Sequence, residues 1–111
     1  MEVRDIFELR RGSDEDKVRA YDIIRARYKT YHGYHTTLCM FWCASDVMQI
    51  RLREAAEAKR TEDYATAKVK IEEAEKIYAA LKRMLPTMRD DDIIGDQMLK
   101  LDILLDEERV Y

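Results

Sequence analysis

The chain is poor in the residues that make turns. Its 111 residues include 3 glycines and 1 proline, whereas a β-sandwich or barrel needs many turns and usually builds them from these residues. Charged residues make up 39% of the sequence and hydrophobic residues 47%, which is enough apolar material for a core with the charge on solvated faces. The composition therefore predicts an all-α protein with a few long helices.

Cysteines and long apolar runs are scarce as well. Cys39 and Cys43 are the 2 cysteines, and on a predicted helix both side chains lean the same way, so we expect reduced thiols and a cytoplasmic protein rather than a disulfide. The longest apolar run, residues 38–44, is far shorter than the roughly 20 residues of a spanning helix. The charged N-terminal stretch is unlike a secretory signal. We expect a soluble protein that does not enter a membrane.

Charge of one sign does not dominate. The formal net charge is −3, with 12 basic and 10 acidic residues in 1–60 (+2) and 8 and 13 in 61–111 (−5). Neither half is a polyelectrolyte, so charge alone does not indicate non-specific nucleic-acid binding.

Residues 37–59 form the element around which we expect the fold to be built. Every residue from Leu38 to Cys43 is apolar. The second half is apolar on one side only, at Met48, Leu52, Ala55 and Ala56. Because a helix that is apolar all round must be enclosed by other elements, we expect the other helices to surround this segment and to leave no cleft for a reaction.

Start and stop signals divide the chain into a bundle of four main antiparallel helices and a short N-terminal helix, in a single domain 1–111. The expected helices are 2–11, ended by Gly12 as a left-handed C-cap; a second from Ser13, with Asp16 as its capping-box partner, to about Tyr31; a third from Thr36 or Thr37 to Arg60; a fourth over 62–85, capped by Thr61 and stopped by Pro86; and a fifth over 92–109, capped by Asp90 or Asp91.

Small residues mark places where helices are expected to approach closely. Ala55 and Ala58 on the third predicted helix and Ala67 and Ala74 on the fourth are typical of a tight helical hairpin. Gly95 weakens the first turn of the last helix by about 1 kcal/mol relative to alanine, and we expect it to admit another backbone.

One set of residues has the chemistry of a metal site but not the spacing. His35, Cys39 and Cys43 follow one another at intervals of four, and imidazole and thiolate suit zinc. Along one helix, however, they span about 12 Å at 1.5 Å per residue, which is too far for one ion, so a site would need ligands from a second chain. We therefore favour buried core cysteines, and we predict no metal and no cofactor.

Catalytic patterns are missing from the sequence. There is no glycine-rich phosphate loop, no His-Glu-x-x-His pattern and no serine at a strained elbow. The 2 histidines adjoin a single glycine loop. We predict that the protein is not an enzyme and has no small-molecule substrate.

Two surfaces are candidate binding sites. Carboxylates on the last helix can occupy a basic groove on a partner, with capping and solvation as the alternative reading. We predict partner-binding roles for Asp91, Asp102 and Asp106, together with the loop aromatics Tyr34 and His35. Basic residues can instead neutralise phosphates beside stacking aromatic rings, and the candidates for that role are Arg25, Arg27 and Lys29.

These features favour a non-enzymatic macromolecule-binding protein. It would be a subunit, adaptor or inhibitor that docks on a larger protein assembly, or a homo-oligomer that uses spare apolar residues of the central and last helices. The partner would be a protein or a second copy. The alternative is a small nucleic-acid-associated regulator that uses the basic and aromatic region 19–35.

Overall fold

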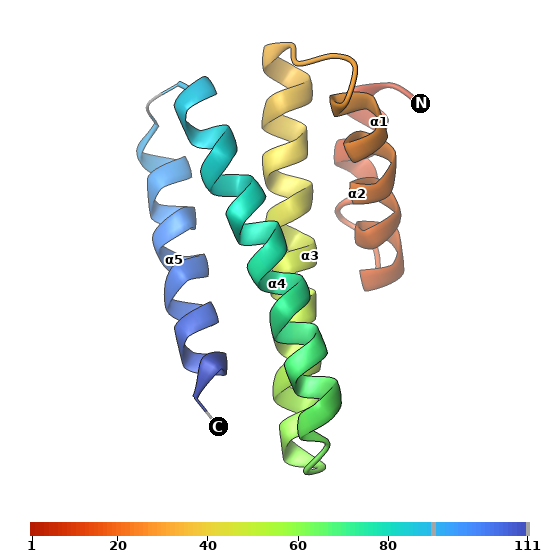
Figure 1. Cartoon of the computed structure of the whole chain (residues 1–111). Helices are drawn as coiled ribbons and strands as arrows, with labels where there is room; N and C mark the ends of the chain where they lie inside the picture. The colour runs from red at the N-terminus through yellow and green to blue at the C-terminus, as the bar shows by residue number, and fades with distance from the viewer. Residues whose placement is uncertain (90, 111) are drawn as a thin grey trace.

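The protein folds as a helical bundle in the computed structural model, which describes residues 1–89 and 91–110. The helices are α1 (Val3–Leu9), α2 (Asp14–Tyr28), α3 (Tyr34–Arg60), α4 (Tyr64–Met84) and α5 (Asp92–Arg109), with a 3-10 turn, η1, at Leu85–Thr87. The predicted class is confirmed: four main helices and a short N-terminal helix, with no strand over the described residues (Figure 1). Within the same residues, no helix has the length and apolarity that a membrane crossing needs.

Helix α3 lies at the centre of the bundle. It stands between α1 and α2 on one side and α4 and α5 on the other (Figure 1). Phe41, Cys43 and Met48 are fully buried, as expected for a helix that is apolar on several sides. Leu38 and Trp42, however, are only half-buried, so the enclosure of this segment is incomplete.

The α3–α4 hairpin is tight, as its alanines predict. Ala55, Ala67 and Ala74 have no exposed surface, on two helices that pack against each other. The connection is a Schellman-type turn in which Glu62 adopts a φ of 60° and its N–H donates to the carbonyl of Lys59 at 3.0 Å. This hairpin places the C-terminal half of α3 beside the N-terminal half of α4 (Figure 1).

The start of α4 differs from its prediction. Thr61 is the C-cap of α3, and the N-cap of α4 is Asp63, whose carboxylate accepts a hydrogen bond from the N–H of Thr66 at 3.1 Å. Because Glu62 adopts a left-handed conformation between the two helices, the N-cap of α4 is Asp63, two positions after the predicted Thr61.

The connection between α2 and α3 was also predicted incorrectly. Helix α2 ends at Tyr28, and α3 begins at Tyr34 with Gly33 as its N-cap. Thr36 and Thr37 lie buried in the first turn, where the Thr37 hydroxyl donates to the carbonyl of His32 at 3.2 Å. The predicted loop aromatics Tyr34 and His35 are therefore the first two residues of α3.

The N-terminal connection confirms one prediction and corrects another. Ser13 and Asp16 form the expected capping box, because the Ser13 hydroxyl accepts from the Asp16 N–H and the Asp16 carboxylate accepts from the Ser13 N–H, each at 3.2 Å. Gly12 is not a left-handed C-cap, and its φ is not positive. A Cβ at this position would lie 2.1 Å from Oδ2 of Asp16, so the glycine leaves room for the capping carboxylate.

The C-terminal helix follows Pro86, which lies in η1 directly after α4 ends, as expected. Asp91 is its N-cap and accepts from the N–H of Ile93 at 2.8 Å; Asp90, the other candidate, lies outside the described residues. Gly95 was expected to admit another backbone, but a Cβ there would meet nothing within 4 Å. That expectation is wrong, because this side of α5 faces open solvent.

Candidate functional site

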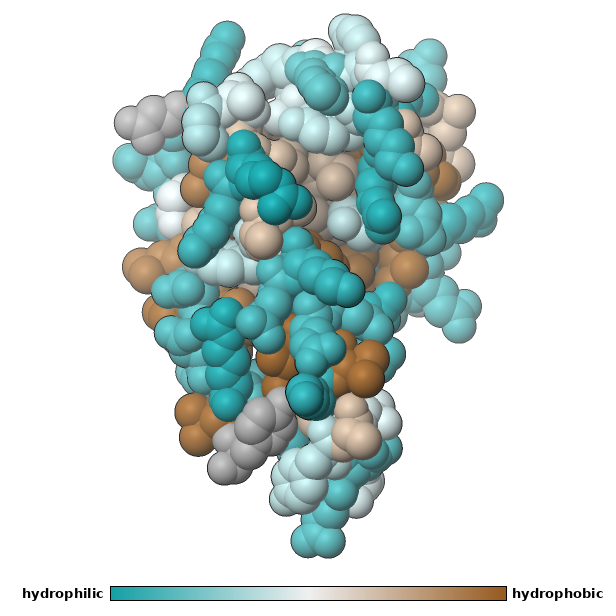
Figure 2. All heavy atoms as spheres, in the orientation of Figure 1, coloured by the Kyte–Doolittle hydropathy of each residue, from teal (hydrophilic) through white to brown (hydrophobic). Residues whose placement is uncertain are grey.

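A groove of about 450 Å³ lies between α2 and α4, with α3 at its bottom. Its floor is apolar and is formed by Val18, Tyr21, Met40, Val47 and Ile77. Its charged edges are formed by Asp22, Arg25, Arg51, Glu73, Lys76 and Arg83. We call this feature the α2–α4 groove. In Figure 2, apolar and pale atoms are visible between hydrophilic side chains in this region of the surface.

The edges of the α2–α4 groove carry positive charge that the described residues do not fully neutralise. Arg51 is compensated, because its guanidinium lies 2.9 Å from a carboxylate oxygen of Glu73 and 2.7 Å from one of Glu54. Lys76 and Arg83 are exposed two helical turns apart on α4, and neither forms an ion pair with the described residues. The groove can therefore attract carboxylates along its α4 edge.

The α2–α4 groove bears on the expectation that the Leu38–Cys43 segment leaves no cleft for a reaction, because a groove does reach this segment. Met40 is part of the groove floor, although only 6% of its surface is exposed. The lining contains no histidine, cysteine, serine or threonine. What this arrangement can do is hold apolar side chains between charged edges.

Two stripes run along opposite sides of α5. The inner stripe consists of Ile94, Met98, Leu101 and Leu105, all buried. The outer stripe consists of Asp92, Asp96, Leu99, Ile103 and Asp106, all exposed. Both repeat at intervals of four and three, which places each set on one helical face. Leu99 is 60% exposed and Ile103 is 50% exposed, and apolar atoms protrude at the edge of the molecule where α5 lies (Figure 2).

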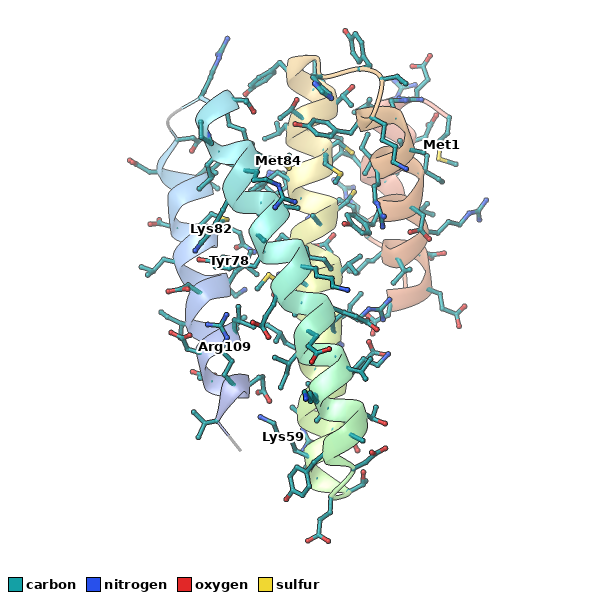
Figure 3. The ribbon with its side chains drawn as sticks, in the orientation of Figure 1. Met1, Lys59, Tyr78, Lys82, Met84 and Arg109 are labelled. Atoms are coloured by element: carbon teal, nitrogen blue, oxygen red, sulfur yellow. The ribbon has the colours of Figure 1, made fainter. Side chains whose placement is uncertain are left out.

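Of the two α5 carboxylates predicted to bind a partner, Asp102 lies at the seam between α4 and α5 and Asp106 lies on the outer stripe. Burial and a hydrogen bond to the Asp102 carboxylate raise the pKa of Tyr78, and Lys82 lies 5.0 Å from the centre of the same ring. Asp106 is exposed and accepts from Arg109 at 3.1 Å. Tyr78, Lys82 and Arg109 are labelled in Figure 3, in the region where α4 and α5 lie side by side. Asp102 is thus half-buried against α4, whereas Asp106 remains on the outer stripe and Asp91 caps the helix.

A second hollow, of about 850 Å³, lies where α1 meets the start of α3. We call it the aromatic hollow. Its lining includes Arg27, Tyr31, Tyr34 and His35, of which Tyr31 and Tyr34 are 62% and 50% exposed. The Arg27 guanidinium donates to the carbonyl of Met1. Two predicted partner-binding residues and one predicted nucleic-acid residue are therefore brought together.

The other two basic candidates lie elsewhere. Arg25 lines the α2–α4 groove, with its guanidinium 5.9 Å from the centre of the Tyr21 ring. Lys29 is exposed at the C-cap of α2. Because residues two apart project from different sides of a helix, Arg27 does not share one basic patch with Arg25 and Lys29.

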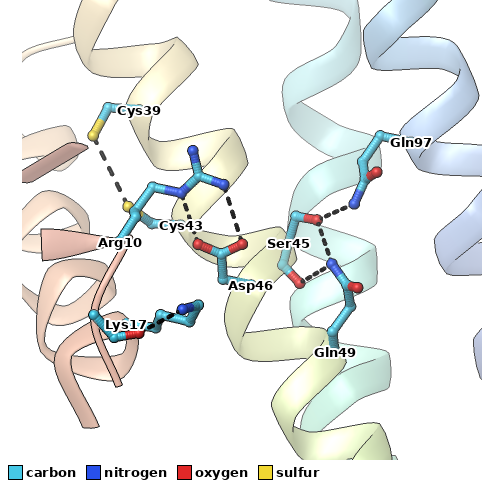
Figure 4. Close-up of polar contacts among 9 residues, drawn as sticks. Arg10, Lys17, Cys39, Cys43, Ser45, Asp46, Gln49 and Gln97 are labelled. Carbon is cyan, nitrogen blue, oxygen red and sulfur yellow. Dashed lines mark hydrogen bonds and ion pairs between the residues drawn. The ribbon is translucent and has the colours of Figure 1, made fainter. Parts of the chain in front are cut away.

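The two cysteines are buried thiols whose sulfur atoms lie 3.9 Å apart (Figure 4). Their mutual hydrogen bond, together with Arg10, lowers the pKa of Cys39, while the same hydrogen bond and burial raise the pKa of Cys43. His35 is exposed beside Tyr34, whereas both thiols are buried. Among the residues that the structure describes, no three histidine, cysteine or acidic side chains are grouped to hold a metal.

Sequence reasoning missed the α2–α4 groove and identified the outer stripe only in part. The groove is formed by residues from three helices, and no pattern within any one helix marks it. A signal for the outer stripe was present, because 92, 96, 99, 103 and 106 follow helical spacing. The sequence analysis expected spare apolar residues on the last helix, but it did not place Leu99 and Ile103 together with the carboxylates on one face.

No protein-family model, curated protein or solved structure matches the chain. The proposal for its function therefore rests on the geometry of its own surfaces.

Proposed function

We propose that the protein is a non-enzymatic binding module that receives an acidic amphipathic helix in the α2–α4 groove. The observation that supports this proposal is an apolar floor bordered by the unneutralised cations Lys76 and Arg83. Docking of an amphipathic helix in an apolar groove is a recurrent mode of recognition, in which residues at intervals of three and four enter the groove. Such a module acts as a subunit, adaptor or inhibitor within a larger assembly, and a cytoplasmic location is part of the proposal.

The dimensions of the groove favour a short helix. Met40 and Val47 are seven residues apart on α3, as are Lys76 and Arg83 on α4, and seven residues rise about 10 Å along a helix. The floor and the basic edge therefore run in parallel over two turns. An occupant with leucines on one face and carboxylates beside them would fit both.

A labelled synthetic helix tests this proposal. Its sequence places leucines on one face and glutamates along one flank, and binding is followed by fluorescence anisotropy. We expect the double variant Lys76→Glu/Arg83→Glu to weaken binding by about tenfold or more, because like charges then face each other across the contact. The control Arg19→Glu/Lys68→Glu makes the same change of charge at exposed positions of α2 and α4 outside the groove, and it should bind as the wild type does.

The location of the bound helix is a separate measurement. On binding, the methyl resonance of Met40 should shift, whereas that of the exposed Met1 should not. Equal binding of a lysine-flanked helix, or equal loss in both double variants, would contradict the proposal.

The aromatic hollow favours a second candidate function, binding of single-stranded nucleic acid. Exposed rings of Tyr31 and Tyr34 beside Arg27 are suited to stacking on bases and contacting phosphate. If this is correct, an oligonucleotide should bind at low salt and dissociate steeply as salt rises, and Tyr34→Ala should weaken binding by about tenfold. No binding at low salt would remove this candidate.

A further inference from the structure

The chain itself carries a helix face of the kind that the α2–α4 groove would receive. The outer stripe of α5 places exposed Leu99 and Ile103 between the carboxylates of Asp96 and Asp106. We infer that the occupant of the groove is α5 of a second copy of this chain, seated by its outer stripe. This inference rests on the proposed function and names its partner.

The charges of the two surfaces are opposite. Residues 92–109 contain six carboxylates and two basic side chains. The edges of the groove contain four basic and two acidic side chains, of which Arg51 and Glu73 are paired with each other. On α5, Asp106 is paired with Arg109 and Glu108 with Lys59, whereas Asp92 and Asp96 form no ion pair with the described residues. Complementary potentials bring two surfaces together and fix their register, which is the role assigned here to Lys76 and Arg83.

The apolar parts of the two surfaces also correspond in length. Leu99 and Ile103 are one turn apart, or about 6 Å, which fits within the two turns of the apolar floor. The carboxylates of Asp96 and Asp106 lie beyond this pair, about 15 Å apart. The long side chains of Lys76 and Arg83 can reach outward to them from positions about 10 Å apart on α4.

A chain cannot fill its own groove in this way. Helix α4 lies between α5 and the α2–α4 groove (Figure 1), and α5 is fixed in place by its inner stripe. The contact is therefore heterologous, with the stripe of one copy on the groove of the next, and such contacts produce rings or open chains rather than a closed pair. Because the outer stripe offers two exposed apolar side chains, Leu99 and Ile103, we expect weak association that strengthens with concentration and weakens with salt.

Two variants, each with one surface disabled, test the inference by analytical ultracentrifugation. The groove variant is Lys76→Glu/Arg83→Glu, and the stripe variant is Leu99→Gln/Ile103→Gln; all four positions are exposed, and circular dichroism should confirm that both fold. The wild type and the control Arg19→Glu/Lys68→Glu should increase in average mass with concentration. Each surface variant alone should remain a monomer.

Mixing the two surface variants is the decisive measurement. In the mixture, the groove variant supplies an intact outer stripe and the stripe variant supplies an intact groove. We therefore expect a 1:1 dimer and no larger species. A monomeric wild type at concentrations of about 1 mM, well above those at which a specific interface is occupied, would overturn the inference. So would surface variants that still associate, or a mixture that stays monomeric.

The two proposals fail separately. If the wild type is monomeric but the synthetic acidic helix binds the groove, the second copy is excluded as the occupant and the proposed function stands. If neither the synthetic helix nor a second copy binds, both proposals fall.

Discussion

The two outer helices, α1 and α5, are attached to adjacent residues of α3 by different chemistry. Arg10, which follows α1, forms a two-bonded ion pair with Asp46, at 2.7 and 3.1 Å. On the other side, Gln97 of α5 donates to the hydroxyl of Ser45 at 2.6 Å (Figure 4). One attachment is charged and half-buried, and the other is neutral and centred on a serine with no exposed surface.

The difference follows from how much apolar surface each helix buries. Helix α1 has 7 residues and one buried residue, Ile6, whereas α5 has 18 residues and buries its whole inner stripe. A helix of one or two turns is only marginally stable without tertiary contacts. The ion pair between Arg10 and Asp46 therefore has to help hold α1 in place. The Arg10 guanidinium also lies 5.6 Å from the centre of the Trp42 ring. Helix α1 is therefore expected to open separately from the rest of the bundle.

The largest expected effect concerns the inner stripe. Leu101→Ala should lower the free energy of unfolding by about 3 kcal/mol, because it leaves a cavity at a fully buried position. Leu99→Ala is the matched control two residues away on the outer stripe, and it should change stability by no more than about 0.5 kcal/mol. Urea titrations followed by circular dichroism measure both. Equal losses of unfolding free energy in the two variants would mean that Leu99 packs against the rest of the bundle.

The next effect concerns the attachment of α1. Asp46→Ala leaves the half-buried Arg10 guanidinium without its partner and should cost about 2 kcal/mol. The apolar replacement Arg10→Met should restore part of this loss when the two changes are combined, as expected for residues in direct contact.

The single tryptophan makes the opening of α1 visible. In Asp46→Ala, Trp42 fluorescence should change at a lower urea concentration than the helical circular dichroism signal, because Arg10 no longer ties α1 to α3. Coincident transitions would show that α1 unfolds with the bundle, and the comparison between the two outer helices would then lose its basis.

Much of the fold was predictable because its signals are local. The capping box of Ser13 and Asp16 and the stop at Pro86 each lie within a few residues of the boundary they set. The errors occurred where tertiary contacts override a local preference. Threonine is a good N-cap, but Thr36 is almost fully buried and α3 begins earlier, at a glycine cap.

The candidate surfaces were less predictable because they depend on contacts distant in sequence. Arg10 and Asp46 are 36 residues apart, and the α2–α4 groove joins residues of three helices. A periodic pattern can show that α5 has exposed apolar residues, but not that Lys76 and Arg83 border an apolar floor.

A smaller effect is expected at the neutral attachment. Ser45→Ala removes the acceptor of Gln97 and should cost about 1 kcal/mol, less than Asp46→Ala, because the half-buried Gln97 amide can turn toward water. The inner stripe should keep α5 in place. Trp42 fluorescence and circular dichroism should then report the same transition, in contrast to Asp46→Ala.

The smallest effects concern two glycines, Gly12 after α1 and Gly95 within α5, and they should have opposite signs. Gly95→Ala should raise the free energy of unfolding by up to about 1 kcal/mol, because alanine favours the helix and its Cβ meets nothing within 4 Å. Gly12→Ala should lower it by about 0.5–1 kcal/mol, because the new Cβ displaces the Asp16 carboxylate from the Ser13 N–H. Thermal melts of the two variants measure both changes. A loss at Gly95 would mean that α5 has a close neighbour at its start, and unchanged stability at Gly12 would mean that the capping box adds nothing to α2.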